Sequence, residues 1–128
     1  MKTALINAAL VGSGGFAGAI LRYALGGLVH RAAPMTTFPL GTLAVNLAGC
    51  LSIGVLAGMA DSRQLLGPEA RTFALIGLLG GFTTFSTFGY ETLALVRAAE
   101  YARASANVCL HLILGLGLVW LGFSLASR

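Results

Sequence analysis

The stretch GGFTTFSTF, residues 80–88, lies in an uncharged apolar segment and decides the fold of this chain. Two glycines followed by Thr and Ser, whose hydroxyls compete for nearby backbone groups, are a poor composition for a helix interior. The stretch therefore predicts a break in a helix. The alternative is an intact helix whose Thr and Ser hydroxyls bond back to carbonyl groups of the same helix.

The composition indicates that this segment crosses a membrane. Of the 128 residues, 57% are hydrophobic and 9% are charged, and the mean hydropathy is +0.88. A water-soluble fold of this size cannot keep so much apolar surface inside, which excludes soluble enzymes, nucleic-acid modules and disordered proteins. The net charge of +4 comes from residues that neither cluster nor line a stripe, so we expect no nucleic-acid partner.

Four segments are long and apolar enough to cross the hydrocarbon, which takes roughly 20 helical residues. They cover about residues 4–29, 40–60, 71–96 and 102–126, and the connections between them carry prolines, glycines and charges. The prediction is an all-α membrane protein, one transmembrane domain over residues 1–128 with four helices and a broken third helix. Unwound backbone at membrane depth is stable only where protein surrounds it or where it lines a polar cavity.

The Lys and Arg residues are divided almost evenly between the two sides of the membrane. One side carries Lys2, Arg63, Arg71 and Arg128, and the other carries Arg31, Arg97, Arg103 and, near the interface, Arg22. The positive-inside rule, which orients a protein by its loop charges, therefore has little to act on. Either a weak bias still selects one orientation, or the chain inserts both ways and forms an antiparallel, dual-topology homodimer.

Phe82, Phe85 and Phe88 are spaced three residues apart, which predicts one slightly drifting stripe on a helix. Such a stripe usually packs in a core. The alternative is an anion path, because ring edges carry partial positive charge. Hydroxyl residues interleave with the rings: Thr83, Thr84, Ser86 and Thr87.

Two further pairs of polar residues lie one helical turn apart inside predicted spans. Thr42 and Asn46 share a face of the second span, and Asn107 and His111 share a face of the fourth. Asn46 either bonds a neighbouring helix or offers its N–H groups to an anion, and for His111 we expect a satisfied bond to another helix. The acidic residues are predicted at or beyond the span ends, so the charge inside the membrane favours anions: Asp61, Glu69, Glu91 and Glu100.

Small residues recur four positions apart, the spacing that lets membrane helices approach closely. The pairs are Gly14 and Gly18, Gly54 and Gly58, and Gly77 and Gly81. They serve either tight packing within one chain or a specific dimer face. Cys50 and Cys109 lie in apolar stretches and predict neither a disulfide nor a metal site. No catalytic constellation is visible, so we do not expect an enzyme.

Taken together, these residues resemble the Fluc (CrcB) fluoride channels. The resemblance rests on GGFAGA at 14–19 leading to Arg22 and Tyr23, on GTLAVNLAG at 41–49, and on GFTTFSTF at 81–88. It implies a multi-pass protein of the bacterial inner membrane that lets fluoride leave passively down its gradient. It also implies an antiparallel dual-topology homodimer in the lipid bilayer.

The resemblance further implies roles for individual residues. Phe85, Phe88 and Asn46 match pore residues of the family, and Ser86 and Thr42 match its polar side, to which the Thr87 hydroxyl adds a donor. Arg22 matches a basic residue of the first span, with a structural or vestibule role. The carbonyls of Gly80 and Thr83 match those that hold a structural sodium ion at the dimer centre. Gly115 and Val119 depart from the family, where some members carry Ser or Thr.

Two other classes remain open at this point. Small multidrug-resistance proteins are coupled exporters of similar size and dual topology, but they resemble antiporters built on a glutamate in the first span. The first apolar run of this chain, residues 3–21, has no carboxylate. A non-transporting assembly subunit is also compatible with the composition.

Overall fold

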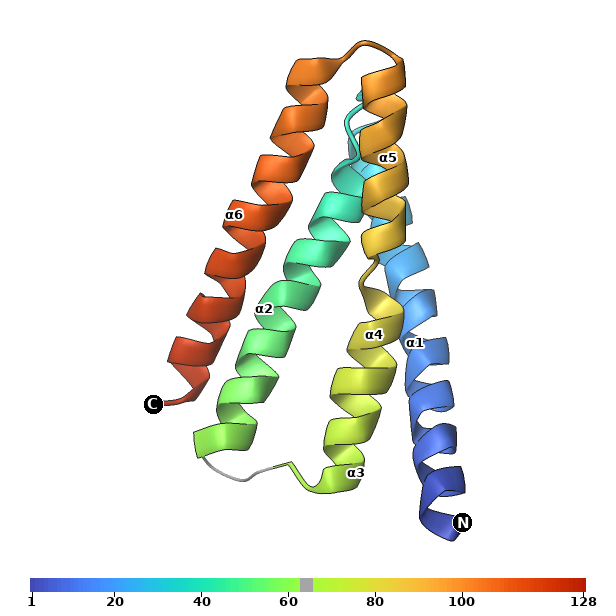
Figure 1. The fold of residues 1–128 in the computed structure, drawn as a ribbon, viewed down its shortest axis with the longest axis vertical. Helices are drawn as coiled ribbons and strands as arrows, with labels where there is room; N and C mark the ends of the chain where they lie inside the picture. The colour runs from blue at the N-terminus through green and yellow to red at the C-terminus, as the bar shows by residue number, and fades with distance from the viewer. Residues whose placement is uncertain (63–65) are drawn as a thin grey trace.

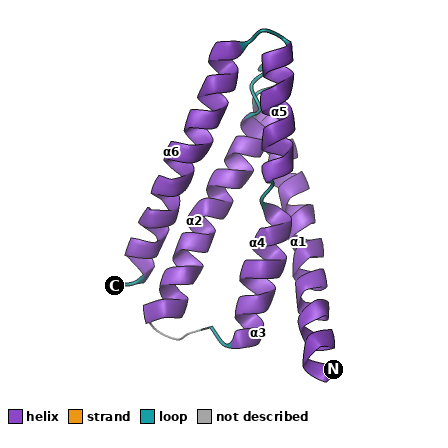
Figure 2. Cartoon of the chain, viewed as in Figure 1, coloured by secondary structure: helices purple, strands orange, loops and turns teal. Residues whose placement is uncertain are grey.

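The computed structural model describes residues 1–62 and 66–128, and these residues form helices and connecting loops with no strand among them (Figure 2). Four helical segments in this part of the chain are long and apolar enough to cross a membrane. Two are α1 (Lys2–Ala32) and α2 (Leu40–Ser62), and the fourth is α6 (Tyr101–Ala126). The third runs from Pro68 to Arg97 and consists of α3 (Pro68–Arg71), the π-helical η1 (Thr72–Leu78), α4 (Leu79–Phe82) and α5 (Phe85–Arg97).

The helices are arranged as two close pairs (Figure 1). α1 packs along η1 and α4, and α2 packs along α6. Both termini lie at the lower end of the bundle in Figure 1, and the connection from α5 to α6 lies at the upper end. Arg97 ends α5 and Arg31 lies in the last turn of α1, so these two cations lie at the end opposite the termini.

Glycines set the distance between the paired helices. A Cβ atom added at Gly14 would lie 2.6 Å from the Phe73 carbonyl oxygen of η1, and one added at Gly122 would lie 2.5 Å from the Leu51 carbonyl oxygen of α2. In lipid, helices gain little from hydrophobic burial against each other, so close van der Waals contact holds them together. The small-residue pairs found in the sequence make such contacts within this chain, with Gly58 against Phe123 as a further example.

The third helix is broken, as the sequence predicts, but the break lies at the threonines and not at the glycines. Gly80 and Gly81 belong to α4, whereas Thr83 (φ −83°, ψ 158°) and Thr84 (φ −150°, ψ 112°) are extended. The Thr84 hydroxyl caps α5 by accepting a hydrogen bond from the Thr87 amide. This Thr cap competes with continuation of the helix.

The break also changes the expected arrangement of the phenylalanines. Phe82 is the last residue of α4 and Phe85 is the first of α5. The expectation of one helical stripe is therefore wrong, because two extended residues separate these side chains. Phe82 packs near Gly49 of α2, with 3.4 Å between its ring and a Cβ built there.

Gly14→Ala and Gly12→Ala form a matched pair that tests the close packing of α1. A Cβ at Gly12 meets nothing within 4 Å, whereas one at Gly14 meets the backbone of η1. Alanine is a better helix former than glycine by about 1 kcal/mol, so Gly12→Ala should leave thermal stability in detergent unchanged or slightly higher. Overpacking should make Gly14→Ala less stable by about 1–3 kcal/mol. Equal melting of the two variants would contradict the close approach.

Candidate functional site

Asn46 of α2 binds both polar groups of the Thr84 backbone, at the point where the third helix breaks. Its Oδ1 accepts a hydrogen bond from the Thr84 amide at 2.8 Å, and its Nδ2 donates to the Thr84 carbonyl at 3.0 Å. A side-chain amide has two N–H donors. The second N–H of Asn46 therefore remains available, since no other described residue accepts it.

Hydroxyl groups cluster at the start of α5. Thr84 Oγ1 accepts from the Thr87 amide at 3.2 Å and donates to Thr87 Oγ1 at 2.9 Å, and Ser86 Oγ lies 3.4 Å away. Thr84 is buried, whereas Ser86 and Thr87 are exposed in the single chain. The cluster thus extends from the interior of the bundle to its surface.

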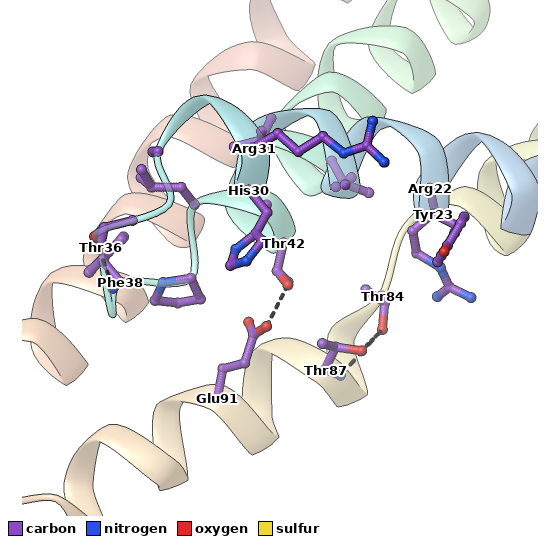
Figure 3. A pocket seen from close by; sticks show the side chains of 18 residues that line it. Arg22, Tyr23, His30, Arg31, Thr36, Phe38, Thr42, Thr84, Thr87 and Glu91 are labelled. Carbon is purple, nitrogen blue, oxygen red and sulfur yellow. Dashed lines mark hydrogen bonds between the residues drawn. The ribbon is translucent and has the colours of Figure 1, made fainter.

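A cavity of about 570 Å³, which we call the vestibule, opens between α1, α2 and α5. Its polar lining includes Arg22 from α1, Thr42 from α2, and Thr84, Thr87 and Glu91 from the third span. Figure 3 shows Thr42 and Glu91 pointing toward one another across it, and Thr42 Oγ1 donates to Glu91 Oε1 at 2.7 Å. The vestibule therefore offers hydroxyl groups, one carboxylate and two guanidinium groups, because Arg31 lines it as well as Arg22.

Glu91 corrects the expectation that every acidic residue lies at or beyond a span end. It belongs to α5, within the span from Pro68 to Arg97, and it is half-buried. Only one of its oxygens has a partner, because Oε2 is buried without a hydrogen bond among the described residues. The sequence did contain a signal: Thr84, Thr87 and Glu91 recur at helical spacing on one face.

A second cavity, of about 390 Å³, lies next to the vestibule at Thr84, and we call it the aromatic cavity. Asn46, Phe85, Phe88 and His111 line it together with Cys50. The rings of Phe85 and Phe88 are 5.4 Å apart between centroids and tilted by 51°. No acidic side chain lines this cavity in the part of the chain that the structure describes.

Phe88 is held by a closed loop of contacts between α5 and α6. Thr92 Oγ1 donates to the Phe88 carbonyl at 2.8 Å and accepts from Asn107 Nδ2 at 2.9 Å. His111 Nδ1 lies 2.9 Å from the Asn107 carbonyl, and the His111 ring lies 4.4 Å from the Phe88 ring between centroids. The expected bond from His111 to another helix is wrong, since its bond lies within α6 and Nε2 is buried without a described partner.

The structure divides the predicted site residues between the two cavities. Arg22, Thr42 and Thr87 line the vestibule. Asn46, Phe85, Phe88, Gly80 and Thr83 line the aromatic cavity, and Ser86 lines neither. Thr84 lines both, so its bridge to Asn46 lies at their junction.

The two positions that depart from the resemblance lie where α2 meets α6. A Cβ at Gly115 would lie 3.4 Å from Cys50 Sγ, and one at Gly54 would meet the Val119 carbonyl. Sequence reasoning overlooked Thr92 altogether. Its partner Asn107 lies fifteen residues further along the chain, on the next helix, and the sequence gives no sign that the two meet.

Comparisons with known proteins agree over almost the whole chain. The family described as CrcB-like protein, Camphor Resistance (CrcB), matches residues 9–123. A protein of Methylobacillus flagellatus named fluoride-specific ion channel FluC is 47% identical over 92% of both chains. A protein of the same name from Chlorobaculum tepidum is 48% identical over 94% of both. A third, from Nitratidesulfovibrio vulgaris, is 45% identical over 88% of this chain and 90% of its own.

Asn46→Leu tests whether the bridge to Thr84 supports the helix break. The variant leaves the Thr84 amide and carbonyl unpaired, and each buried group left without a partner costs about 1–3 kcal/mol. Thermal unfolding in detergent should therefore show a loss of about 2–6 kcal/mol for the two groups. Ser52→Ala is the control on the same helix, because its hydroxyl only bonds the Ala48 carbonyl of α2 at 2.8 Å. If both variants melt like the parent chain, the bridge is dispensable.

Proposed function

Because this chain belongs to the CrcB-like protein family, we propose that it forms a fluoride-selective channel through which the anion leaves the cytoplasm passively. The aromatic cavity is the observation that carries this proposal. It combines an Asn46 amide with a spare N–H, two phenylalanine rings and no described acidic lining. Such a lining offers a small anion a hydrogen-bond donor and ring edges, with no carboxylate among its described residues.

The two cavities support a path with two stages. In the vestibule, the Arg22 guanidinium attracts anions. The Thr87 hydroxyl accepts from Thr84 and keeps its own hydrogen to donate, whereas the Thr42 hydroxyl already donates to Glu91. Fluoride is strongly hydrated, so a narrow path must replace its water with other donors. The second N–H of Asn46 and the ring edges of Phe85 and Phe88 supply that replacement, since the amide and hydroxyl of Thr84 already donate to Asn46 and Thr87.

Passive export meets a simple chemical need. Hydrogen fluoride is a weak acid that crosses membranes as a neutral molecule and ionises in a near-neutral cytoplasm, which traps fluoride there. A downhill exit is therefore sufficient. The chain is a multi-pass membrane protein by its four spans, and we place it in the inner membrane of a bacterium, as the resemblance implies.

Glu91 is the one observation that favours a second candidate function, that of a coupled exporter like the small multidrug-resistance proteins. Such an exporter needs a carboxylate inside the membrane, and Glu91 lies within the third span with one oxygen unpaired. However, its other oxygen is held by Thr42, and α1 carries no Asp or Glu. These facts favour the channel.

The exposure of the helix break supports a homodimer. In the single chain, 82% of Phe85 is exposed, and Gly80, Ser86 and Thr87 beside the break are exposed as well. Lipid cannot satisfy an open helix end, so a second copy would cover this face. Lys and Arg are divided almost equally between the two sides of the membrane, which supports an antiparallel arrangement. Arg63, which is counted in that division, lies outside the described residues.

The carbonyls of Gly80 and Thr83 suit the structural sodium ion that the resemblance implies. Each lacks its normal helix partner, because the Thr84 amide donates to Asn46 and the Thr87 amide donates to the Thr84 hydroxyl. Nothing lies within 4 Å of a Cβ built at Gly80, so a second chain has room to approach. A bound sodium ion would supply the positive charge that lets carbonyl dipoles of two chains converge.

Phe85→Ile and Phe88→Ile test the channel function. Isoleucine keeps most of the volume, so folding should change by less than about 1.5 kcal/mol, while the polarised ring edge is lost. Fluoride efflux from liposomes should fall at least about tenfold, which corresponds to a barrier increase of about 1.4 kcal/mol. Phe82→Ile, on the other side of the break, is the control and should transport nearly normally.

Two controls complete this experiment. Chloride-loaded liposomes measure the selectivity for fluoride, and an uncoupler removes the proton gradient. No fluoride efflux from the parent chain would overturn the proposal, and efflux that stops when the proton gradient is removed would favour the coupled exporter. Unchanged efflux in both isoleucine variants would assign the rings to packing alone.

Exchange of sodium for a large organic cation tests the structural ion. The dimer should dissociate or melt at a lower temperature without sodium, and lithium or sodium should restore it better than the organic cation. Thr83→Ser keeps the carbonyl and should behave like the parent chain, whereas Gly80→Val should prevent assembly by blocking the close approach. An intact, active dimer after exhaustive exchange would refute the ion.

A further inference from the structure

One ring nitrogen of His111 is hydrogen-bonded, and the other has no hydrogen-bond partner among the described residues. Nδ1 lies 2.9 Å from the Asn107 carbonyl oxygen. A carbonyl only accepts, so Nδ1 carries the proton of this bond and neutral His111 has a bare lone pair on Nε2. That atom is buried without a hydrogen-bond partner among the described residues. An unpaired buried acceptor is costly, which marks Nε2 as a candidate ligand atom.

The surroundings of His111 make the permeating anion the natural partner. Its ring packs on Phe88 at 4.4 Å between centroids, and it lines the aromatic cavity with Asn46 and Phe85. These are the residues that the proposed function assigns to the anion. Protonation of Nε2 would turn the atom from a lone pair that repels fluoride into a charged N–H donor that binds it.

Few other titratable groups face His111. Glu91 of α5 interacts electrostatically with it, and Cys50 of α2 lines the same cavity. The parts of η1 and α4 that line the cavity contribute only Leu75, Leu79 and Gly80, and α1 contributes no residue to it. On α6 itself, Cys109 is exposed and is not part of the cavity lining.

We propose that His111 is a further pore residue whose protonation raises fluoride flux. This inference rests on the proposed function and deepens it. Each hydrogen fluoride molecule that ionises in the cytoplasm releases one proton and one fluoride ion. The cytoplasm therefore becomes more acidic as fluoride accumulates in it. A path that conducts better with protonated His111 would carry more fluoride when more has accumulated. A histidine that only packs against Phe88 predicts a flux independent of pH.

Single-channel fluoride currents in planar bilayers test this inference, because they do not register neutral hydrogen fluoride. Currents are compared at about pH 5.5 and about pH 8, on either side of the range in which histidine normally titrates. The parent chain should conduct about tenfold better at the acidic value, as a charged donor replaces a lone pair. His111→Gln should lose this pH response. His30→Gln replaces the other of the 2 histidines. His30 lines the vestibule and not the aromatic cavity, so this variant should keep the pH response whatever its total current.

A second measurement uses His111 itself and does not depend on a variant at that site. In His30→Gln protein with ¹⁵N-labelled imidazole, NMR follows the single remaining ring in detergent. Fluoride should raise the pH at which its Nε2 signal titrates, because ligand binding and protonation are linked reciprocally, and chloride should not. The signal at high pH should be that of a ring protonated on Nδ1.

The outcomes separate the two proposals. A parent chain that conducts fluoride equally at both pH values, or a His111→Gln variant that keeps the pH response, overturns the role of His111 and leaves the channel intact. No fluoride current at any pH counts against the channel, and the NMR titration then decides the inference. A titration that fluoride does not shift overturns it.

Discussion

Inside a membrane, every backbone amide and carbonyl that leaves a helix needs a partner from the protein. In this chain the Asn46 side chain provides that partner for Thr84, accepting at 2.8 Å and donating at 3.0 Å. A side-chain amide can do both, because it carries an acceptor and donors on one planar group. The break in the third helix, and with it the division of the interior into two cavities, depends on this bridge.

The break has chemical consequences on both of its sides. It releases the Thr84 hydroxyl to cap α5 and gathers Ser86 and Thr87 around it. It also leaves the carbonyls of Gly80 and Thr83 without their usual amide partners. The break thus places acceptors for a cation, the carbonyls of Gly80 and Thr83, close in the chain to the Thr87 hydroxyl, which keeps its hydrogen to donate.

The aromatic part of the site is held by a second set of contacts. Phe88 is not only packed but tied through its carbonyl to Thr92, through Thr92 to Asn107, and through Asn107 to the His111 ring that lies against it. Asn107 is fully buried. These contacts link Phe88 to α6, although Asn107 Oδ1 and His111 Nε2 remain buried without a hydrogen-bond partner among the described residues.

Much of this architecture follows from the sequence alone. Four apolar segments of sufficient length dictate four spans because lipid admits only helices with satisfied backbones, and the composition of residues 80–88 predicts a broken helix. The motif around Phe85 and Phe88 and the spacing of Thr42 and Asn46 also identify most of the candidate site. Each of these inferences uses local composition or spacing within one segment.

The tertiary structure decided what depends on contacts between segments. Thr84, not the glycines, marks the break because Asn46 of another helix binds its backbone. Glu91 became a site residue because it meets Thr42, and His111 kept an unpaired nitrogen because its bond partner lies on its own helix. A sequence shows which residues can form hydrogen bonds, but which of them meet is determined by how the helices pack, since partners far apart in the chain come together only in the fold.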